Sequence, residues 1–346
     1  MPPASHIIAA ALRTWDDPVV DRGIYGTVDP DEIAAIADEF VHTHLGARIN
    51  EHLFFSTSVG SVHGLVLSDA RRIILKIYPR DRWPGWADHL RAVHRVQHHL
   101  ADAGYPCPRP LIGPHPCAYG LAIAESFLAV GDHADPFDPH IRRTIAAGLA
   151  ELVARTREFA DTPGLRPSLL HDAGGSVWPT PHSALFDFSR EPARAAWIDD
   201  WARRARASDP DVGAWIVGHI DWRAEHLRFT AGRITTVYDW DSLARIREPA
   251  LVGQVARAFP ADWQRDGVRC VPDLEDILGF LADYEAARGA PFTRDERRSA
   301  RAACVYAIAY TARCGHALDP DETEDRAGGR SFRGLLARHA ADLLVG

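Results

Sequence analysis

A short run near the centre of the chain constrains its fold more than any other feature. Residues 218–226 read GHIDWRAEH, and residues 238–241 read YDWD, which puts Asp239 eighteen residues after Asp221. Between them, an Ala-Gly-Arg turn signal at 231–233 separates two short apolar segments, which predicts a β-hairpin. Because paired strands lie about 5 Å apart, the loops at the open end of a hairpin are neighbours. The two aspartates are therefore predicted to lie close together.

Two neighbouring carboxylates suit phosphoryl transfer. One can accept the proton of an attacking hydroxyl, and the other can hold a divalent cation through oxygen, which Mg²⁺ prefers. Phosphoryl transfer needs mainly positioning and charge neutralisation, so these groups suffice if a nucleotide binds close by. Aspartate is also common in loops because its side chain caps backbone groups. The pair by itself therefore leaves a structural role open.

The run resembles the catalytic loop of the protein-kinase-like fold, and most of all that of the aminoglycoside phosphotransferase family of small-molecule kinases. The family pattern is H-x-D-x-x-x-x-N, a hairpin, and then D-x-D or a related acidic motif. His219, Asp221 and Asp239 match its bracing, catalytic and metal-binding positions. The resemblance implies that Arg223 contacts the transferred phosphate. It covers roughly residues 50–260 in motif order.

The fold implied by the resemblance is α+β with two lobes, a small antiparallel β-sheet N-lobe and a larger, mostly helical C-lobe. We expect residues 1–50 to form an N-terminal helical extension and residues 51–128 to form the N-lobe, with its nucleotide-binding sheet and helix. Residues 129–346 would form the helical C-lobe, with the catalytic loop and the acceptor site. Local patterns point the same way, since 51–78 reads as an antiparallel meander of three strands and 86–103 as a helix.

Lys76 lies in an apolar strand, where a buried ammonium needs an anionic partner. The resemblance implies that it holds nucleotide phosphates, and the alternative is a strand-edge lysine that faces water. A turn containing Ser58, Gly60 and Ser61 precedes it. The backbone N–H groups and hydroxyls of this turn could contact phosphate oxygens, although Ser/Gly turns are also common for structural reasons.

The strand that ends near Glu125 and Phe127 falls where the family has its hinge, the segment whose backbone and apolar contacts hold the nucleotide base. Side-chain identity says little about backbone contacts. This assignment therefore rests on position along the chain.

Two positions depart from the family pattern. His226 stands where the family has an asparagine that binds metal, and imidazole suits Mn²⁺ or Zn²⁺ better than Mg²⁺. His226 is therefore either a metal ligand or a structural residue. The 86–103 helix also lacks the glutamate that would pair with Lys76, and Gln97 could hydrogen-bond that lysine instead. Within the helix, His94 and His98 share one side, which we expect to be a solvated polar face.

Composition limits the partners. The formal net charge of −8 argues against a nucleic-acid-binding surface, and no apolar stretch approaches the ~20 residues of a membrane span. Five cysteines without a CxxC pair, and no signal-like N-terminus, favour a cytoplasmic setting. An acidic chain is compatible with a cationic acceptor, for which Asp241, Glu248 and Asp262 are candidate contacts.

Taken together, these features predict an ATP- or GTP-dependent phosphotransferase that uses Mg²⁺, with Mn²⁺ as the second choice. Its acceptor would be a hydroxyl of a small molecule, such as an aminoglycoside-like or other cationic compound. The departures at His226 and in the 86–103 helix motivate an alternative, a catalytically weak kinase-fold protein that binds nucleotide or ligand in a regulatory role. The oligomeric state stays open.

Overall fold

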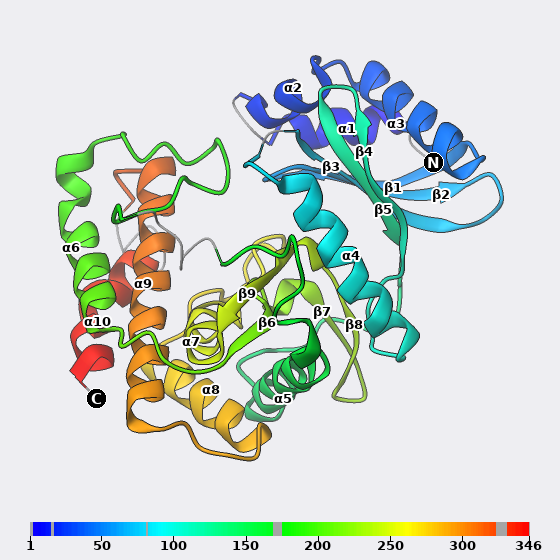
Figure 1. The fold of residues 1–346 in the computed structure, drawn as a ribbon. Coiled ribbons are helices and arrows are strands. Elements are labelled where there is room, and N and C mark those ends of the chain that lie inside the picture. Colours follow the sequence, from blue (N-terminus) through cyan, green and yellow to red (C-terminus); the bar gives the residue numbers. More distant parts are fainter. Residues whose placement is uncertain (1–2, 15–16, 81, 169–174, 323–330, 346) are drawn as a thin grey trace. The chain divides into compact units, whose positions relative to one another are not determined.

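The chain combines a β-rich first unit with a mostly helical second unit (Figure 1). The computed structural model describes residues 3–14, 17–80, 82–168, 175–322 and 331–345. The first unit comprises Met1–Ala129 and His182–Leu185, and the second comprises Val130–Pro181 and Phe186–Gly346. A four-residue segment of the later chain therefore belongs to the first unit.

An antiparallel sheet forms the centre of the first unit. In the order in which they pair, its strands are β1 (Ile49–Thr57), β2 (Ser61–Leu67), β3 (Arg72–Pro79), β5 (Gly120–Ser126) and β4 (Pro110–Cys117). The consecutive pairing of β1, β2 and β3 confirms the predicted meander. Strand β4 was not predicted, because three prolines interrupt its pattern. It lies at the edge of the sheet, where proline is tolerated.

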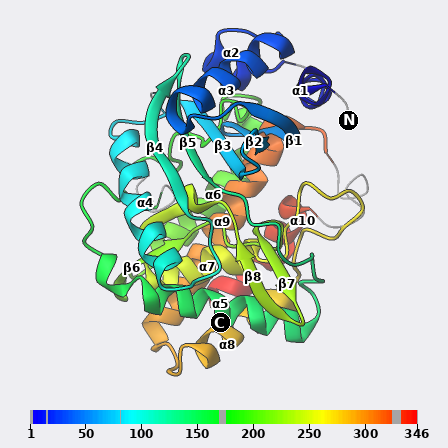
Figure 2. The same ribbon diagram turned by 90° about the vertical axis from the view of Figure 1, so that its right-hand side faces the viewer.

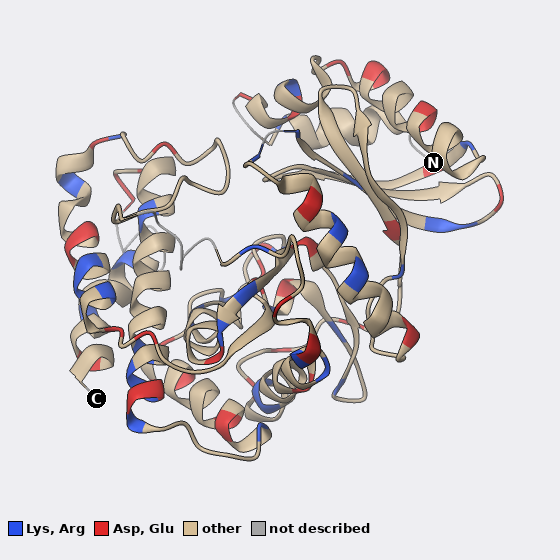
Figure 3. Cartoon of the chain, viewed as in Figure 1, with Lys and Arg blue, Asp and Glu red and all other residues tan. Residues whose placement is uncertain are grey.

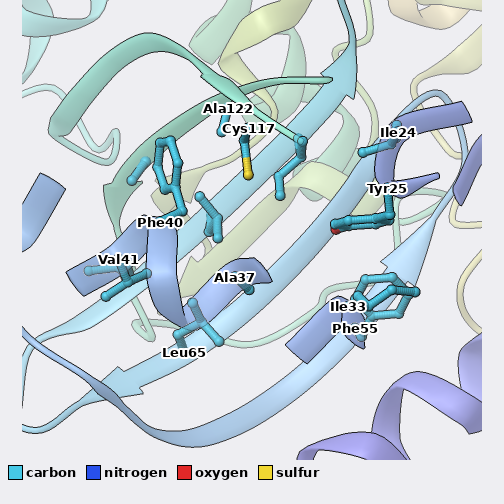
Figure 4. Packing of buried hydrophobic residues seen from close by; sticks show 14 of the residues in the cluster. Ile24, Tyr25, Ile33, Ala37, Phe40, Val41, Phe55, Leu65, Cys117 and Ala122 are labelled. Carbon is cyan, nitrogen blue, oxygen red and sulfur yellow. The ribbon is translucent and has the colours of Figure 1, made fainter. Parts of the chain in front are cut away.

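Different helices cover the two faces of this sheet. On one face lie α1 (Ala4–Leu12), α2 (Val19–Tyr25) and α3 (Pro30–Leu45), whose apolar side chains pack on the strands (Figure 4). The opposite face is covered by α4 (Trp86–Asp102), which packs Trp86 and Leu90 against Tyr78 and Ile123. The predicted N-terminal helical extension is thus one layer of the same compact unit as the sheet.

A buried polar contact joins α2 to the sheet. The Tyr25 hydroxyl lies 2.5 Å from Ser61 Oγ and 2.7 Å from His63 Nε2. Burial, assisted by the neighbouring His52, lowers the pKa of His63 to about 3. The imidazole of His63 is therefore neutral in the folded protein at neutral pH.

The second unit is built mainly from helices. They are α5 (Pro139–Arg155), α6 (Pro192–Ser208), α7 (Glu248–Ala258), α8 (Leu274–Ala287), α9 (Arg294–Leu318) and α10 (Phe332–Val345), with short 3₁₀ turns η1 (Arg157–Phe159), η2 (Ala224–His226) and η3 (Trp240–Ser242). Two small antiparallel pairs accompany them, β6 (Trp215–His219) with β9 (Leu243–Arg247) (Figure 1) and β7 (Leu227–Thr230) with β8 (Arg233–Val237) (Figure 2). The β7–β8 pair confirms the predicted hairpin.

Charged side chains of both signs are mixed along the outer helices. Both basic and acidic positions occur along α6 and along the first turns of α9 (Figure 3). None of the helices in the described ranges is long and apolar enough to cross a membrane.

We expect Gly253→Ala to destabilise the second unit strongly. Helices α7 and α9 approach so closely here that an added Cβ would lie 1.8 Å from the Ala300 carbonyl oxygen. Backbone cannot yield as a side chain can, so the loss in the free energy of unfolding is at least about 2 kcal/mol. Gly315→Ala in α9 is the matched control, since the nearest atom to an added Cβ there is the Glu322 carboxylate oxygen, 4.0 Å away. That substitution should be neutral or stabilise by up to about 1 kcal/mol. Equal denaturation midpoints for the two variants would contradict the close packing.

The free energy of unfolding of the first unit should decrease as the pH is lowered, because of His63. Its pKa is about 3 when folded and about 6.5 when unfolded. The unfolded state therefore binds the proton first. The contribution of His63 is complete above about pH 6.5 and is lost as the pH falls toward 3. Between pH 7 and pH 5 this amounts to about 2 kcal/mol.

The measurement is the pH slope of the free energy of unfolding. In His63→Gln the decrease in the free energy of unfolding between pH 7 and pH 5 should be smaller by about 2 kcal/mol. The exposed His42→Gln in α3 should leave it unchanged. An unaltered slope in His63→Gln would refute the assignment.

Candidate active site

The run 218–226 forms a loop whose backbone is fixed by the surrounding structure. Strand β6 ends at His219, and the loop that follows leads through η2 into β7. The Ile220 amide donates to the Ser242 carbonyl (3.0 Å), and the Ala224 amide donates to the Phe259 carbonyl (2.9 Å). These bonds attach the loop to the start of β9 on one side and to the end of α7 on the other.

Two buried side chains support this loop from below. Trp222 is fully buried, and its indole N–H donates to the Ile145 carbonyl of α5 (3.0 Å). His219 Nε2 donates to the carbonyl of Tyr238 (2.9 Å), the residue directly before Asp239. Burial lowers the pKa of His219, so the ring is neutral. His219 therefore links the two acidic motifs through one hydrogen bond.

Three side chains converge at the open end of the β7–β8 hairpin. One ligand atom from each of Asp221, His226 and Asp239 lies within 4.8 Å of the others. His226 Nε2 is 3.3 Å from Asp221 Oδ2 and 3.9 Å from Asp239 Oδ2. Two carboxylates and one imidazole form a donor set that fits a divalent cation, and the imidazole favours Mn²⁺ over Mg²⁺. The proximity expected from the hairpin geometry is confirmed.

Asp239 occupies an unusual backbone conformation. Its φ is +65°, in the left-handed region, which aspartate tolerates better than most residues. The Ser242 hydroxyl donates to Asp239 Oδ2 (2.8 Å). The turn from β8 into η3 is thereby held in the form that brings Asp239 beside His226.

Arg223 is paired with the predicted catalytic aspartate. Its guanidinium forms an ion pair with Asp221, and its Nε donates to Glu225 Oε2 (3.2 Å). The guanidinium also lies 4.4 Å from the centre of the Trp263 ring. The sequence offered Glu225 as a possible metal ligand beside His226, but its pairing with Arg223, like the contact of Trp263, was not predicted, because a side chain that faces an arginine across a turn leaves no periodic signal.

These charges determine the ionisation of Asp221. Burial opposes its charged form, but Arg223 and His226 outweigh that effect and hold the pKa of Asp221 well below its usual range. The same pairing with Asp221 and Glu225, acting against burial, raises the pKa of Arg223. Asp221 is therefore an anion at every working pH. As a weak base it is suited to orienting a hydroxyl and accepting its proton late in a reaction.

The first unit contains the other group of predicted residues, led by Lys76. Its side chain is buried, with 5% exposed, and it shares the α4 face of the sheet with Tyr78. Lys76 is the only lysine in the chain, since the other 38 basic residues among the 39 are arginines. Counting lysines in the sequence would have identified this position, because every other Lys or Arg position in the chain is an arginine.

The turn between β1 and β2 is tight. The Ser58 amide donates to the Gly60 carbonyl (3.1 Å), and a Cβ on Gly60 would lie 2.7 Å from the Ile77 carbonyl oxygen. The structure corrects the expectation for the Ser61 hydroxyl. It bonds Tyr25 on the α2 face, the face opposite to Lys76, so the backbone of this turn and the exposed Ser58 hydroxyl remain the candidate phosphate contacts.

The predicted hinge also needs correction. The Phe127 amide donates to the Arg72 carbonyl (3.0 Å), so that N–H group is already used by the sheet. Glu125 is buried, with 3% exposed, and its Oε2 accepts a hydrogen bond from Gln97 Nε2 (2.8 Å). The Phe127 N–H group is therefore not available to a base, whereas contacts from the Glu125 backbone and the Phe127 ring stay a prediction.

Two further expectations were wrong. The histidine-rich side of α4 is not uniformly solvated, because His94 is buried against the sheet while His98 is exposed. Glu248 accepts hydrogen bonds from Tyr284 and Arg288, so it is engaged in a structural ion pair. In both cases tertiary packing decides the environment of a polar residue that local sequence leaves open.

Comparison with protein families gave one match. The model described as "APH: Phosphotransferase enzyme family" covers residues 65–245, just over half of the chain. These residues include Lys76, the hairpin and both acidic motifs. A search of curated proteins found no match.

Several solved structures share the fold. One is an amicoumacin kinase in complex with AMP-PNP, Ca²⁺ and Ami, with a TM-score of 0.60 and 12% identity over 91% of this chain and 95% of that one. A second is spectinomycin phosphotransferase with ADP and spectinomycin, with a TM-score of 0.53 and 12% identity over 90% and 97%. A third is an ethanolamine kinase of Plasmodium vivax, with a TM-score of 0.51 and 12% identity over 97% and 94%. At this identity they establish the fold, which is protein-kinase-like and α+β, as predicted.

We expect Asp239 and His226, the two members of this cluster other than Asp221, to bind Mn²⁺. Asp239→Asn should weaken Mn²⁺ binding at least about tenfold, because it removes an anionic ligand. His226→Asn replaces the imidazole by an amide oxygen and should shift the preference from Mn²⁺ toward Mg²⁺. Titration of the free-ion signal of Mn²⁺ by electron paramagnetic resonance measures both effects. Asp241→Asn, which removes the same charge two residues further along, is the matched control. Unchanged Mn²⁺ affinity in Asp239→Asn would overturn the site.

Proposed function

The chain belongs to the phosphotransferase enzyme family and is a small-molecule kinase, and we propose that it transfers the γ-phosphoryl group of ATP or GTP to a hydroxyl group of its acceptor. The observation that carries the proposal is the convergence of Asp221, His226 and Asp239 at the end of one hairpin, with Arg223 paired to Asp221. This arrangement supplies a base, cation ligands and a fixed positive charge in one place.

In the proposed reaction the acceptor oxygen attacks the γ-phosphorus as the bond to the β–γ bridging oxygen breaks. The hydroxyl proton passes to the Asp221 carboxylate, and the nucleoside diphosphate leaves with the electron pair of the broken bond. Arg223 keeps Asp221 ionised and oriented through its ion pair. The low basicity of Asp221 suits a loose transition state, in which the attacking oxygen loses its proton late.

Asp239 and His226 are the residues that would hold a divalent cation, leaving Asp221 to orient the acceptor. When bound, such a cation neutralises charge on the β- and γ-phosphates. Their donor atoms fit this use, because His226 Nε2 and Asp239 Oδ2 lie 3.9 Å apart, a separation that one cation can bridge. His219 keeps the two motifs in register through the Tyr238 carbonyl.

We assign Lys76 to the α- and β-phosphates of the nucleotide. Its burial on an apolar strand supports this role, since a buried ammonium requires anions nearby. Lys76 is also the single lysine of the chain, which further supports its assignment to the phosphates. A compact ammonium on a flexible stem serves a phosphate in a confined position where the larger guanidinium would not substitute. The backbone of the Ser58–Gly60 turn is the second proposed contact.

For the acceptor we propose a hydroxylated cation. Asp241 is half-buried beside the site, and Asp262 carries a buried carboxylate 3.2 Å from His133 Nδ1. Two of the structural neighbours are described as acting on or binding spectinomycin and ethanolamine, and ethanolamine is an amino alcohol. All five cysteines are free thiols, which is compatible with the reducing cytoplasm where ATP and GTP are abundant.

Asp221→Asn tests the proposal. The variant should lose turnover by about 10²–10⁴-fold, because the hydroxyl proton loses its acceptor. Nucleotide binding, followed as a thermal shift, should be retained. The assay measures ADP or GDP released with Mg²⁺ or Mn²⁺ and a panel of amino sugars, amino alcohols and nucleosides. Asp161→Asn, at an exposed aspartate of the same unit, should keep full activity.

Two outcomes would contradict parts of this assignment. Turnover retained in Asp221→Asn would exclude Asp221 as the base. A nucleotide-induced thermal shift without any diphosphate release from the unmodified protein would favour the second candidate, a kinase-fold protein that binds nucleotide in a regulatory role. His226, in place of the family's asparagine, is the observation that keeps this second candidate in view.

A further inference from the structure

The buried face between the sheet and α4 holds a charge arrangement that the family pattern does not describe. Lys76 is buried there, yet α4 contains no glutamate to neutralise it. The acidic residues of α4 are Asp88 and Asp102, which are 72% and 66% exposed and pair with Arg91 and Arg109. Neither carboxylate is therefore available to the Lys76 ammonium.

Strand register identifies a different carboxylate. Lys76 lies opposite Ile123 of β5, and Ile74 lies opposite Glu125. Directly opposed residues point to the same face, so Lys76 and Glu125 share a face at diagonal positions, with Cα atoms about 7–8 Å apart, within reach of two long side chains. On the other side of β3, Lys76 lies opposite Val62 of β2, whose next residue on that face is Gly64. Among these cross-strand neighbours only Glu125 is acidic.

Contacts from α4 confirm which face this is. Gln97 Nε2 donates to Glu125 Oε2 (2.8 Å) and to the Pro108 carbonyl (2.9 Å). Burial, His98 and Lys76 together lower the pKa of His94 to about 4, which puts Lys76 near the same helix. Gln97 thus uses its amide to hold Glu125, and not Lys76 as expected from the sequence.

We propose that Glu125 of β5, held by Gln97 of α4, is the anionic partner that positions Lys76 for nucleotide phosphates. The carboxylate that the family pattern puts on the helix is here supplied by the sheet. The consequence for nucleotide binding rests on the proposed function of Lys76, whereas the pairing itself does not.

The single lysine makes the pairing directly measurable. Protein grown with ¹³C,¹⁵N-lysine gives one Cε resonance, whose shift reports protonation of Lys76 as the pH is raised. In Glu125→Gln the titration midpoint should fall by at least about one pH unit, because the ammonium loses its partner while remaining buried. The dissociation constant for ATP should rise about tenfold, whereas kcat at saturating ATP should change less.

An exchange variant separates pairing from folding. Glu125→Gln combined with Gln97→Glu moves the carboxylate to α4 and the amide to β5 and keeps their number unchanged. This double variant should restore the midpoint to near the wild-type value and the ATP affinity to within about threefold, a residual of under 1 kcal/mol. If Glu125→Gln alone does not fold, the titration midpoint of the lysine resonance in the double variant tests the pairing.

The outcomes distinguish the two proposals. An unchanged lysine midpoint in Glu125→Gln would overturn the pairing, as would a double variant whose midpoint stays low. Lys76→Met that binds ATP as well as the wild-type protein would overturn the nucleotide role of Lys76. In that case the lysine midpoint would still decide the pairing.

Discussion

The hydrogen bond from His219 to the Tyr238 carbonyl joins two segments on which the rest of the site depends. It spans nineteen residues of sequence and connects the end of β6 to the end of β8. Because His219 directly flanks the loop of Asp221, and Tyr238 directly precedes Asp239, this bond fixes the separation of the two carboxylates. Burial keeps His219 neutral, and the tautomer with its proton on Nε2 donates to the carbonyl.

Charge in this protein is organised by local compensation. Asp221 is paired with Arg223 and lies beside His226, and Arg223 is paired in turn with Glu225. Arg223 and His226 together keep Asp221 anionic although it is buried. The proposed cation site then depends mainly on Asp239 and His226, whose imidazole adds a ligand without adding negative charge.

Much of this was predictable because the informative signals were local. The Ala-Gly-Arg turn predicted the β7–β8 hairpin, and the hairpin predicted that Asp221 and Asp239 are neighbours. Strands β4, β6 and β9 were not predicted. Prolines disguise β4, and the other two have five residues each and pair across the whole catalytic segment. Their pairing depends on contacts distant in sequence, which no local pattern encodes.

The errors at individual residues have the same origin. Ser61 and Lys76 were assigned to one phosphate site, but strand alternation sends them to opposite faces of the sheet. Phe127 was assigned by position, yet its amide is taken by a neighbouring strand. Side-chain direction in a sheet follows from register. A register becomes known only when the partner strand is known.

The short segment His182–Leu185 has a consequence for how the chain can be divided. It belongs to the first unit, where the Ser183 hydroxyl donates to the Ser58 carbonyl and Leu185 packs on the apolar layer beneath α1–α3. The polypeptide therefore passes between the units three times, near residues 129, 181 and 185. A fragment that ends at residue 129 would lack the segment His182–Leu185 of its own unit. The remaining fragment would contain that segment without the unit on which it packs. Separate expression of the two halves, or exchange of one half between relatives, thus requires a circularly permuted or grafted segment and not a single cut.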